Sequence, residues 1–275
     1  MNRPPVAADK VPHGAMQDSG KVAAVAYSLL SKAAAMLCPD KPLRVILLGT
    51  NHFVLQPAAC LSTASNWVTP LGAVPVDQQL NEELHVQGIP YDDRPHQQEH
   101  SIENQLPFLQ YICGQQRVFN SSRAGQAPQP DLLVAPVSIG WLAGAEELER
   151  VAEAVAAMLS KEEPGSVILV ATSDFTHAGP SSYKEPPAAG WMSLRDHAIW
   201  RDSPVLHAIE AGSAQAFINL CEAAGTSLCG RWPVAVLMRV AEKLHWDLQL
   251  LSYAPSDLYV QSQDINGFAC FAVWG

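Results

Sequence analysis

The sequence predicts one α/β domain in which helices cover both faces of a central, mostly buried sheet. Strand candidates alternate with helical patterns along the chain. The strands are continuous apolar runs rather than alternating ones, which is typical of strands buried on both faces. The length of 275 residues suits one large domain. Because there is no internal repeat and no composition break, we assign residues 1–275 to a single layered domain.

The first half of the chain begins with a helix over 19–37, where apolar residues recur at helical spacing and Asp18 or Ser19 can cap the start. A short apolar run over 43–48, between Pro42 and Gly49, predicts a buried strand. The remaining expected elements are weaker strands at 58–62 and 67–71, a helix at 77–88 and a helical pattern at 101–113 that Pro107 interrupts.

The second half opens with residues 114–130, which are polar and rich in Gly, Ser and Pro, so we expect a surface loop there. Ser203 and Pro204 form a good N-cap and first-turn pair, which predicts that a new helix begins at 204. The expected strands cover 132–137, 167–171, 248–253 and 268–273, and the expected helices cover 145–161, 193–200, 204–211, 213–224 and 233–245.

Composition excludes several classes of protein. Seventeen basic residues against 27 acidic ones give a net charge of −10, and without a Lys/Arg cluster we expect no nucleic-acid binding. The longest uncharged stretch, 45–76, contains polar residues and prolines, so we expect no membrane insertion. The first 20 residues lack an apolar signal-peptide core, and six cysteines without a C-x-x-C pair indicate a reduced, cytoplasmic protein.

Polar residues that follow the strands point to a shared site, because ligands of such sheets bind beyond the carboxyl ends of the strands. His52 follows the strand at 43–48, and Asp174 and His177 follow the strand at 167–171. Cys229 precedes a helix, where a thiol is expected to have a lowered pKa. His100 lies in a segment whose acids suit a helix start and could orient its ring.

Common catalytic motifs do not occur in the chain. It has no G-x-S-x-G elbow, no phosphate-binding loop of the Walker type, no G-x-G-x-x-G and no H-E-x-x-H. Serine hydrolysis and phosphate binding therefore have no support. A metal or acid–base site made of His, Asp and Cys side chains remains.

These segments, taken in order, resemble the Memo family (mediator of ErbB2-driven cell motility) and its microbial relatives. The resemblance runs over about residues 11–275, and only the ordered set of motifs is specific. The resembling motifs are Pro12-His13, Gly49-Thr50-Asn51-His52, Thr69-Pro70-Leu71, Glu99-His100-Ser101-Ile102-Glu103 with Leu106-Pro107, Ser173-Asp174-Phe175-Thr176-His177, Cys229-Gly230-Arg231 with Pro233, and Ser252-Tyr253-Ala254.

The resemblance implies a fold similar to the catalytic subunit of class III extradiol dioxygenases, which use non-haem Fe(II). It implies metal ligands at His13, His52 and Cys229. His177 would match the acid/base histidine of those enzymes, and Asp174 and His100 would be its neighbours. Two histidines and a thiolate are softer than the two histidines and glutamate of the dioxygenases. They suit Fe(II), which we expect first, and also Cu and Zn.

Two departures from the family pattern affect these expectations. Family members have a longer strand-bearing segment before the Pro-His motif, so we expect the strand before His13 to be short or absent. They also commonly carry two consecutive histidines where this chain has His52-Phe53, so we expect a more apolar pocket.

Three functional readings stay open at this point. The first is a metal-dependent oxidoreductase of the dioxygenase-like kind. The second is a non-catalytic metal binder or redox-signalling adaptor, and the third is a Memo-like fold whose site has decayed. The expected partner is a small molecule or a peptide bound in the pocket, and the sequence does not predict the oligomeric state.

Overall fold

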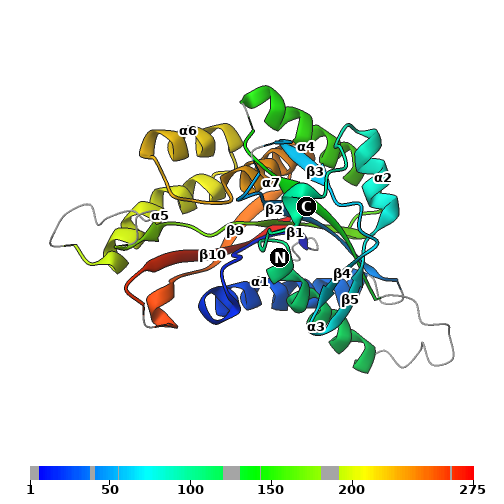
Figure 1. The fold of residues 1–275 in the computed structure, drawn as a ribbon, viewed down its shortest axis with the longest axis horizontal. Coiled ribbons are helices and arrows are strands. Elements are labelled where there is room, and N and C mark those ends of the chain that lie inside the picture. Colours follow the sequence, from blue (N-terminus) through cyan, green and yellow to red (C-terminus); the bar gives the residue numbers. More distant parts are fainter. Residues whose placement is uncertain are drawn as a thin grey trace.

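A mixed sheet forms the centre of the molecule in the computed structural model, which describes residues 6–37, 41–54, 56–119, 131–142, 144–180, 192–260 and 262–275 (Figure 1). Four parallel strands lie side by side in the order β6 (Leu132–Ile139), β2 (Leu43–Thr50), β7 (Val167–Thr172) and β1 (Val6–Val11). β6, β2 and β7 are mostly apolar along their whole length, which is typical of strands with both faces covered, whereas β1 carries Asp9 and Lys10 among its apolar residues.

Antiparallel strands complete the sheet on both sides of this parallel group. β10 (Ile265–Trp274) pairs with β1, and β9 (Asp247–Pro255) pairs with β10. The short β8 (His177–Ala178) pairs with the beginning of β10 on the same side of the sheet. At the opposite edge, β3 (Ala59–Leu61) pairs with β6. A separate hairpin consists of β4 (Asn66–Thr69) and β5 (Gly72–Pro75).

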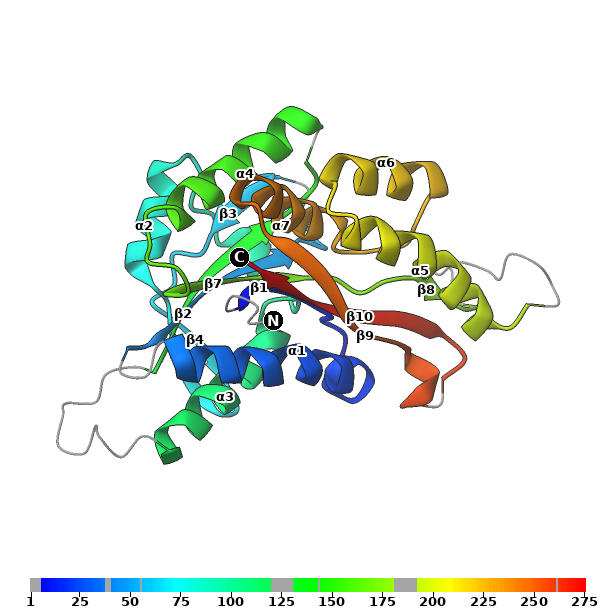
Figure 2. The same cartoon turned by 180° about the vertical axis from the view of Figure 1, so that it is seen from behind.

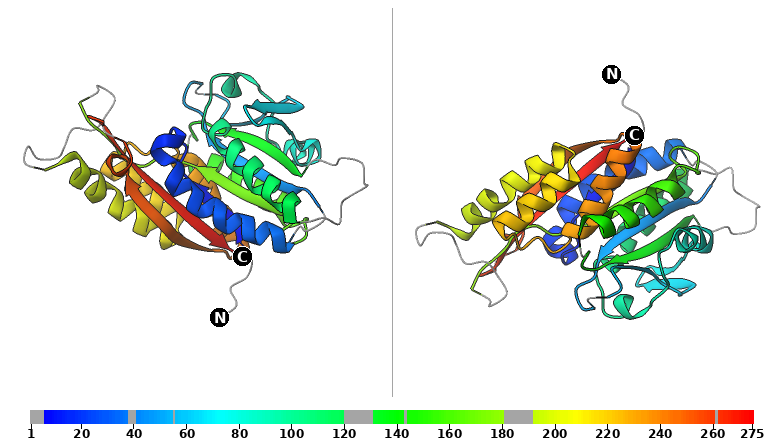
Figure 3. Two further views of the ribbon diagram at one scale, coloured as in Figure 1. Left: turned by 90° about the horizontal axis from the view of Figure 1, so that it is seen from below. Right: turned by 90° about the horizontal axis from the view of Figure 1, so that it is seen from above.

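Helices cover both faces of the sheet, as Figures 2 and 3 show. One face carries α1 (Met16–Leu37) and α3 (Leu106–Phe119), which pack over a core that includes Tyr27 and Leu109. The opposite face carries a larger core beneath α2 (Gln78–Val86), α4 (Ala145–Leu159), α5 (Leu194–Glu210), α6 (Ala214–Ala224) and α7 (Arg231–Leu244). Single 3₁₀ turns lie at Arg94–His96, Glu103–Gln105 and Ser256–Leu258. The predicted α/β class, with a buried sheet between helices, is confirmed.

One helix differs from the sequence prediction. Residues 194–210 form a single helix, α5, and Pro204 lies inside it rather than at the start of a new helix. A proline removes one backbone hydrogen bond, but Asp202, Val205 and Ile209, which belong to this helix, are buried. Burial on both sides of the proline therefore keeps the helix continuous.

The segment 114–130 is a helix in its first part, because α3 continues to Phe119. Residues 120–130 lie outside the described part of the chain. Pro107 does not interrupt α3, since it occupies the first turn, where its missing N–H has no partner to lose.

No described helix is long and apolar enough to cross a membrane.

The strand before His13, which we expect from the sequence to be short or absent, is present and short. β1 has six residues and lies between β7 and β10, so it is a central strand although it is short. Val11 pairs with Thr172 of β7, and Leu48 of β2 pairs with Ala171. The carboxyl ends of β1, β2 and β7 therefore lie side by side along one edge of the sheet, the edge that is formed by strand ends. The segments that carry His13, His52 and Asp174 begin there.

Candidate metal centre

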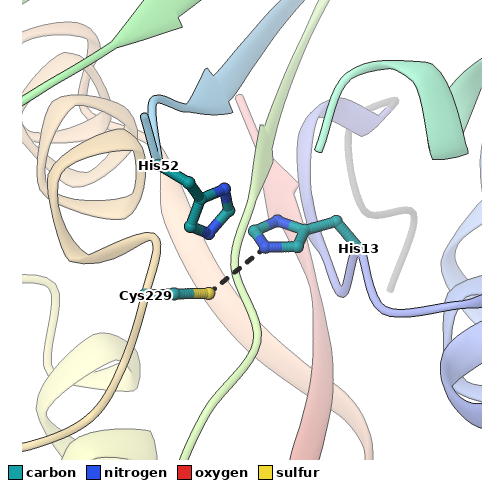
Figure 4. Close-up of side chains that lie close together, drawn as sticks. All are labelled: His13, His52 and Cys229. Carbon is teal, nitrogen blue, oxygen red and sulfur yellow. Dashed lines mark hydrogen bonds between the residues drawn. The ribbon is translucent and has the colours of Figure 1, made fainter. Parts of the chain in front are cut away.

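Three side chains converge at this edge of the sheet, as Figure 4 shows. The cluster consists of His13, His52 and Cys229, and one ligand atom from each lies within 4.8 Å of the others. The Sγ atom of Cys229 is 3.2 Å from Nε2 of His13. The three residues come from the ends of β1 and β2 and from the segment before α7, so the fold assembles the cluster from distant parts of the chain.

His13 is buried and fixed at both ends. Its Nδ1 lies 3.0 Å from the hydroxyl of Thr172, which leaves Nε2 facing Cys229. Its backbone N–H donates to Oδ1 of Asp174 at 2.8 Å. Burial lowers the pKa of His13 to about 4, so the ring is neutral at pH 7. A neutral imidazole is the form that binds metals.

His52 is the solvent-accessible member of the cluster, and Glu99 orients it. Both carboxylate oxygens of Glu99 lie about 3 Å from Nδ1 of His52 (3.0 and 2.9 Å), and one of them also accepts from the His52 backbone N–H. A carboxylate accepts only, so Nδ1 carries the proton and Nε2 is left as the ligand atom. Burial opposes the ionisation of Glu99, but the contacts with His52 outweigh it and lower its pKa to about 2.

Cys229 stands two residues before α7 and is part-buried. The prediction that the pKa of the Cys229 thiol is lowered is wrong for the metal-free protein. Burial, together with the nearby carboxylate of Asp174, raises the pKa of the thiol to about 12. A metal ion would have to displace the thiol proton.

Gly230 allows the Cys229 segment to approach β7. A Cβ atom at this position would overlap the carbonyl oxygen of Thr172 and the backbone of Ser173. The backbone N–H of Gly230 instead donates to Oγ of Ser173 at 2.9 Å. The close approach therefore fixes where Cys229 stands relative to the strand ends.

Asp174 holds the backbone around His13 in place. Its Oδ1 accepts from the N–H groups of His13 (2.8 Å) and Gly14 (3.1 Å), and the side chain is buried. Burial opposes its ionisation, but His13, His177 and the backbone N–H outweigh it and the pKa is lowered. Asp174 thus acts on the cluster by positioning His13.

His177 has a defined orientation beside the cluster. Its Nδ1 donates to the carbonyl oxygen of Ser227 at 3.1 Å, and its backbone N–H donates to Oγ of the same serine. In the neutral ring, Nε2 is then the basic atom. Ligand atoms of His177, Asp174 and Cys229 lie within 4.8 Å of one another, so the predicted acid/base residue stands next to the cluster.

His100 lies at the exposed side of the cluster. Its ring stacks on the ring of His52 with centroids 5.0 Å apart, and its centroid is 5.6 Å from that of His13. Its side chain is 47% exposed. The structure thus brings together all six residues named from the sequence.

Sequence reasoning missed Lys10, which is fully buried in β1 next to the site. Its Nζ donates to the carbonyl oxygens of Ser173 (2.8 Å) and Ala269 (3.0 Å) and lies 4.2 Å from the ring centroid of Phe175. Burial lowers its pKa to about 7. The sequence carried no signal for it, because a charged residue among apolar ones gives no indication of which carbonyls it reaches.

Asp202 on α5 was also missed. Its carboxylate accepts from the N–H of Thr176 (3.0 Å) and from the hydroxyl of Tyr253 (2.8 Å). Burial raises its pKa to about 6. Asp202 thereby holds the segment between Asp174 and His177 against α5, and the Ser252-Tyr253-Ala254 motif was the only sequence signal near it.

The donor set suits a transition metal. Two imidazole nitrogens and one sulfur are available, and the second nitrogen of each ring has a hydrogen-bond partner, Thr172 or Glu99. Such partners orient metal-binding histidines and set which nitrogen faces the ion. This donor set is compatible with Fe(II), Cu and Zn.

Comparisons with known proteins identify the family of the chain. Residues 9–269 match the model of the family described as Memo-like protein. A MEMO1 family protein of Sulfolobus acidocaldarius is 30% identical over 260 residues, covering 93% of this chain and 78% of the relative. A relative from Methanopyrus kandleri is 30% identical, with 94% and 80% covered, and one from Thermoplasma volcanium is 28% identical, with 94% and 82% covered. The chain belongs to the Memo-like family.

Proposed function

We propose that this Memo-like protein binds a transition metal ion through His13, His52 and Cys229, with Fe(II) as the first candidate. We propose further that it is a dioxygenase-like oxidoreductase. The observation that carries the proposal is the convergence of the three ligand atoms within 4.8 Å. The hydrogen bonds that Nδ1 of His13 and Nδ1 of His52 donate to Thr172 and Glu99 support it, because they leave Nε2 of each ring available.

The protein side chains around the cluster have separate tasks in this proposal. Asp174 keeps the His13 backbone in position, and Glu99 fixes the ring of His52. His177 takes a proton from a ligand hydroxyl at Nε2, since Nδ1 is engaged with the Ser227 carbonyl. The bound metal would supply a site for dioxygen and for an oxidisable ligand such as a catechol.

The test begins with protein that is loaded with Fe(II) under anaerobic conditions and then desalted. We expect one iron per chain, and oxygen uptake when catechol is added. His177→Gln keeps the metal and is expected to slow oxygen uptake by 100-fold or more, in line with the loss of a general base. Iron absent from the wild-type protein would contradict the metal site.

A non-catalytic metal binder or redox-signalling adaptor is the second candidate, and the soft thiol favours it. Cys229 stands where the related dioxygenases have a carboxylate, and a thiolate suits Zn and Cu(I) as well as Fe(II). Stoichiometric metal without oxygen uptake in the same experiment would favour this function over the oxidoreductase.

A further inference from the structure

A cation–aromatic cluster lies next to the proposed metal site. It consists of Arg231, Trp141 and Trp232. The guanidinium carbon of Arg231 is 4.6 Å from the ring centroid of Trp141 and 5.3 Å from that of Trp232. The two indole rings meet edge to face at 5.7 Å. Trp232 is buried, whereas Trp141 is 51% exposed.

Arg231 has no anionic partner within the described part of the chain. Every other arginine whose side chain is described there has hydrogen bonds or an ion pair: Arg44, Arg94, Arg150, Arg195 and Arg239 meet carboxylates, and Arg201 donates to carbonyl oxygens. In a chain with 27 acidic and 17 basic residues, an unpaired, half-buried guanidinium is unusual. Among the described residues, none accepts a hydrogen bond from its N–H groups, so these donors remain available to a ligand.

Both sides of this cluster adjoin residues of the metal site. Arg231 follows Cys229 by two positions. Trp141 follows Ile139 by two positions, and the Ile139 carbonyl accepts from the N–H of Asn51, the neighbour of His52. Phe53, which follows His52 in the sequence, is 57% exposed. The segments that carry the guanidinium and the exposed aromatic rings are therefore the same as, or hydrogen-bonded to, those that carry Cys229 and His52.

We propose that Arg231 is the anchor for the carboxylate of a small aromatic ligand that reaches the metal cluster. A guanidinium donates two parallel N–H bonds to a carboxylate, and one positive charge balances one negative charge. The exposed rings of Trp141 and Phe53 offer faces for the aromatic body of the ligand. The inference rests on the proposed function, because it specifies the ligand class of that site.

The test uses benzoate as the probe, titrated into metal-free full-length protein and followed by calorimetry and by tryptophan fluorescence. We expect saturable binding to the wild-type protein and no binding of benzyl alcohol, which lacks the charge. Arg231→Gln is expected to weaken benzoate binding at least tenfold, and Arg231→Lys by less, because a lysine keeps the charge without the paired donors.

Controls separate this anchor from general effects on folding. Arg150→Gln, on the exposed surface of α4, is expected to bind benzoate as the wild type does. Trp141→Leu changes an exposed ring and is expected to weaken binding while leaving the thermal midpoint unchanged. Circular dichroism of each variant shows whether it is folded, and if Arg231→Gln is unfolded, Arg231→Lys and Trp141→Leu decide.

Three results would overturn the inference: no benzoate binding to the wild type, equal binding to wild type and to the folded Arg231 variants, or tighter binding of phenyl phosphate than of benzoate. Its failure is distinguishable from failure of the metal site. Benzoate binding to metal-free His52→Ala supports the anchor whether or not iron binds. Iron binding without benzoate binding removes the anchor and leaves the metal site intact.

Discussion

The two sides of the cluster of His13, His52 and Cys229 differ in how the fold holds them. On the buried side, His13 is 1% exposed and is held by Asp174 and Thr172 at the ends of two central strands. On the exposed side, the His52 side chain is 25% exposed, and a single carboxylate, Glu99, orients it. The buried side therefore belongs to the core, whereas the exposed side is open to solvent.

The largest expected effect comes from Asp174→Ala on the buried side. The change leaves the N–H groups of His13 and Gly14 buried without an acceptor and removes the carboxylate that faces His13 and Lys10. We expect a loss of about 3–5 kcal/mol in the free energy of unfolding, measured by urea denaturation. Glu103→Ala, at an exposed acid near the exposed side, is the control, and an equal loss in both variants would contradict the comparison.

A pH dependence is expected from Asp202. Burial raises its pKa from the ordinary 3.8 to about 6, so between these values the folded chain holds a proton that the unfolded chain has released. The stability contribution of Asp202 therefore falls as pH rises from about 4 to about 6 and is constant above that. A shift of about two pKa units corresponds to about 3 kcal/mol.

Asp202→Asn removes this titration while keeping an oxygen for the Thr176 N–H. Urea denaturation of wild type and variant between pH 4 and pH 7.5 measures it. The stability of the wild type relative to the variant is expected to fall between pH 4 and about 6 and to be constant above that. A constant difference would show that Asp202 is not protonated in the folded chain at pH 5.

Gly230→Ala tests the close approach that places Cys229. The added Cβ would overlap Thr172 and Ser173, so the start of α7 must shift, at a cost of about 1–3 kcal/mol. Gly114→Ala in α3 is the matched control, because no atom lies within 4 Å of its added Cβ. There we expect a gain of about 0.5–1 kcal/mol from helix propensity, and the same sign at both positions would contradict the account.

The smallest effect is expected on the exposed side. His100→Ala removes a ring that is 47% exposed and stacked on His52. We expect the free energy of unfolding to change by no more than about 0.5 kcal/mol in thermal or urea denaturation. A loss comparable to that of Asp174→Ala would mean that both sides of the cluster are part of the core.

The sequence predicted the sheet because β2, β6 and β7 are mostly apolar, with Arg44 as the one charged residue among them. It also placed His52 and Asp174 at one edge, since parallel strands share that edge. The continuous α5 could not be predicted, because burial of Asp202 and Val205 outweighs the local effect of Pro204. β1 was missed because it is short and carries Asp9 and Lys10 between its apolar residues.

The interactions that orient the site were also beyond the sequence. Glu99 faces His52 across 47 positions, and Lys10 meets Ser173 across 163. Burial of Cys229 reversed the pKa expected from its place before a helix. Each of these depends on which distant segments the fold brings together. Local residue patterns do not predict such contacts.

Cobalt(II) titration shows whether Cys229 is a metal ligand, because a cobalt–thiolate bond produces a charge-transfer absorption. We expect the wild-type protein and the control Cys113→Ser to bind one cobalt ion per chain with this absorption. Cys229→Ser is expected to lose the absorption, and His52→Ala to bind cobalt more weakly. No absorption in the wild type, or the same absorption in Cys229→Ser, would contradict a metal site built from His13, His52 and Cys229.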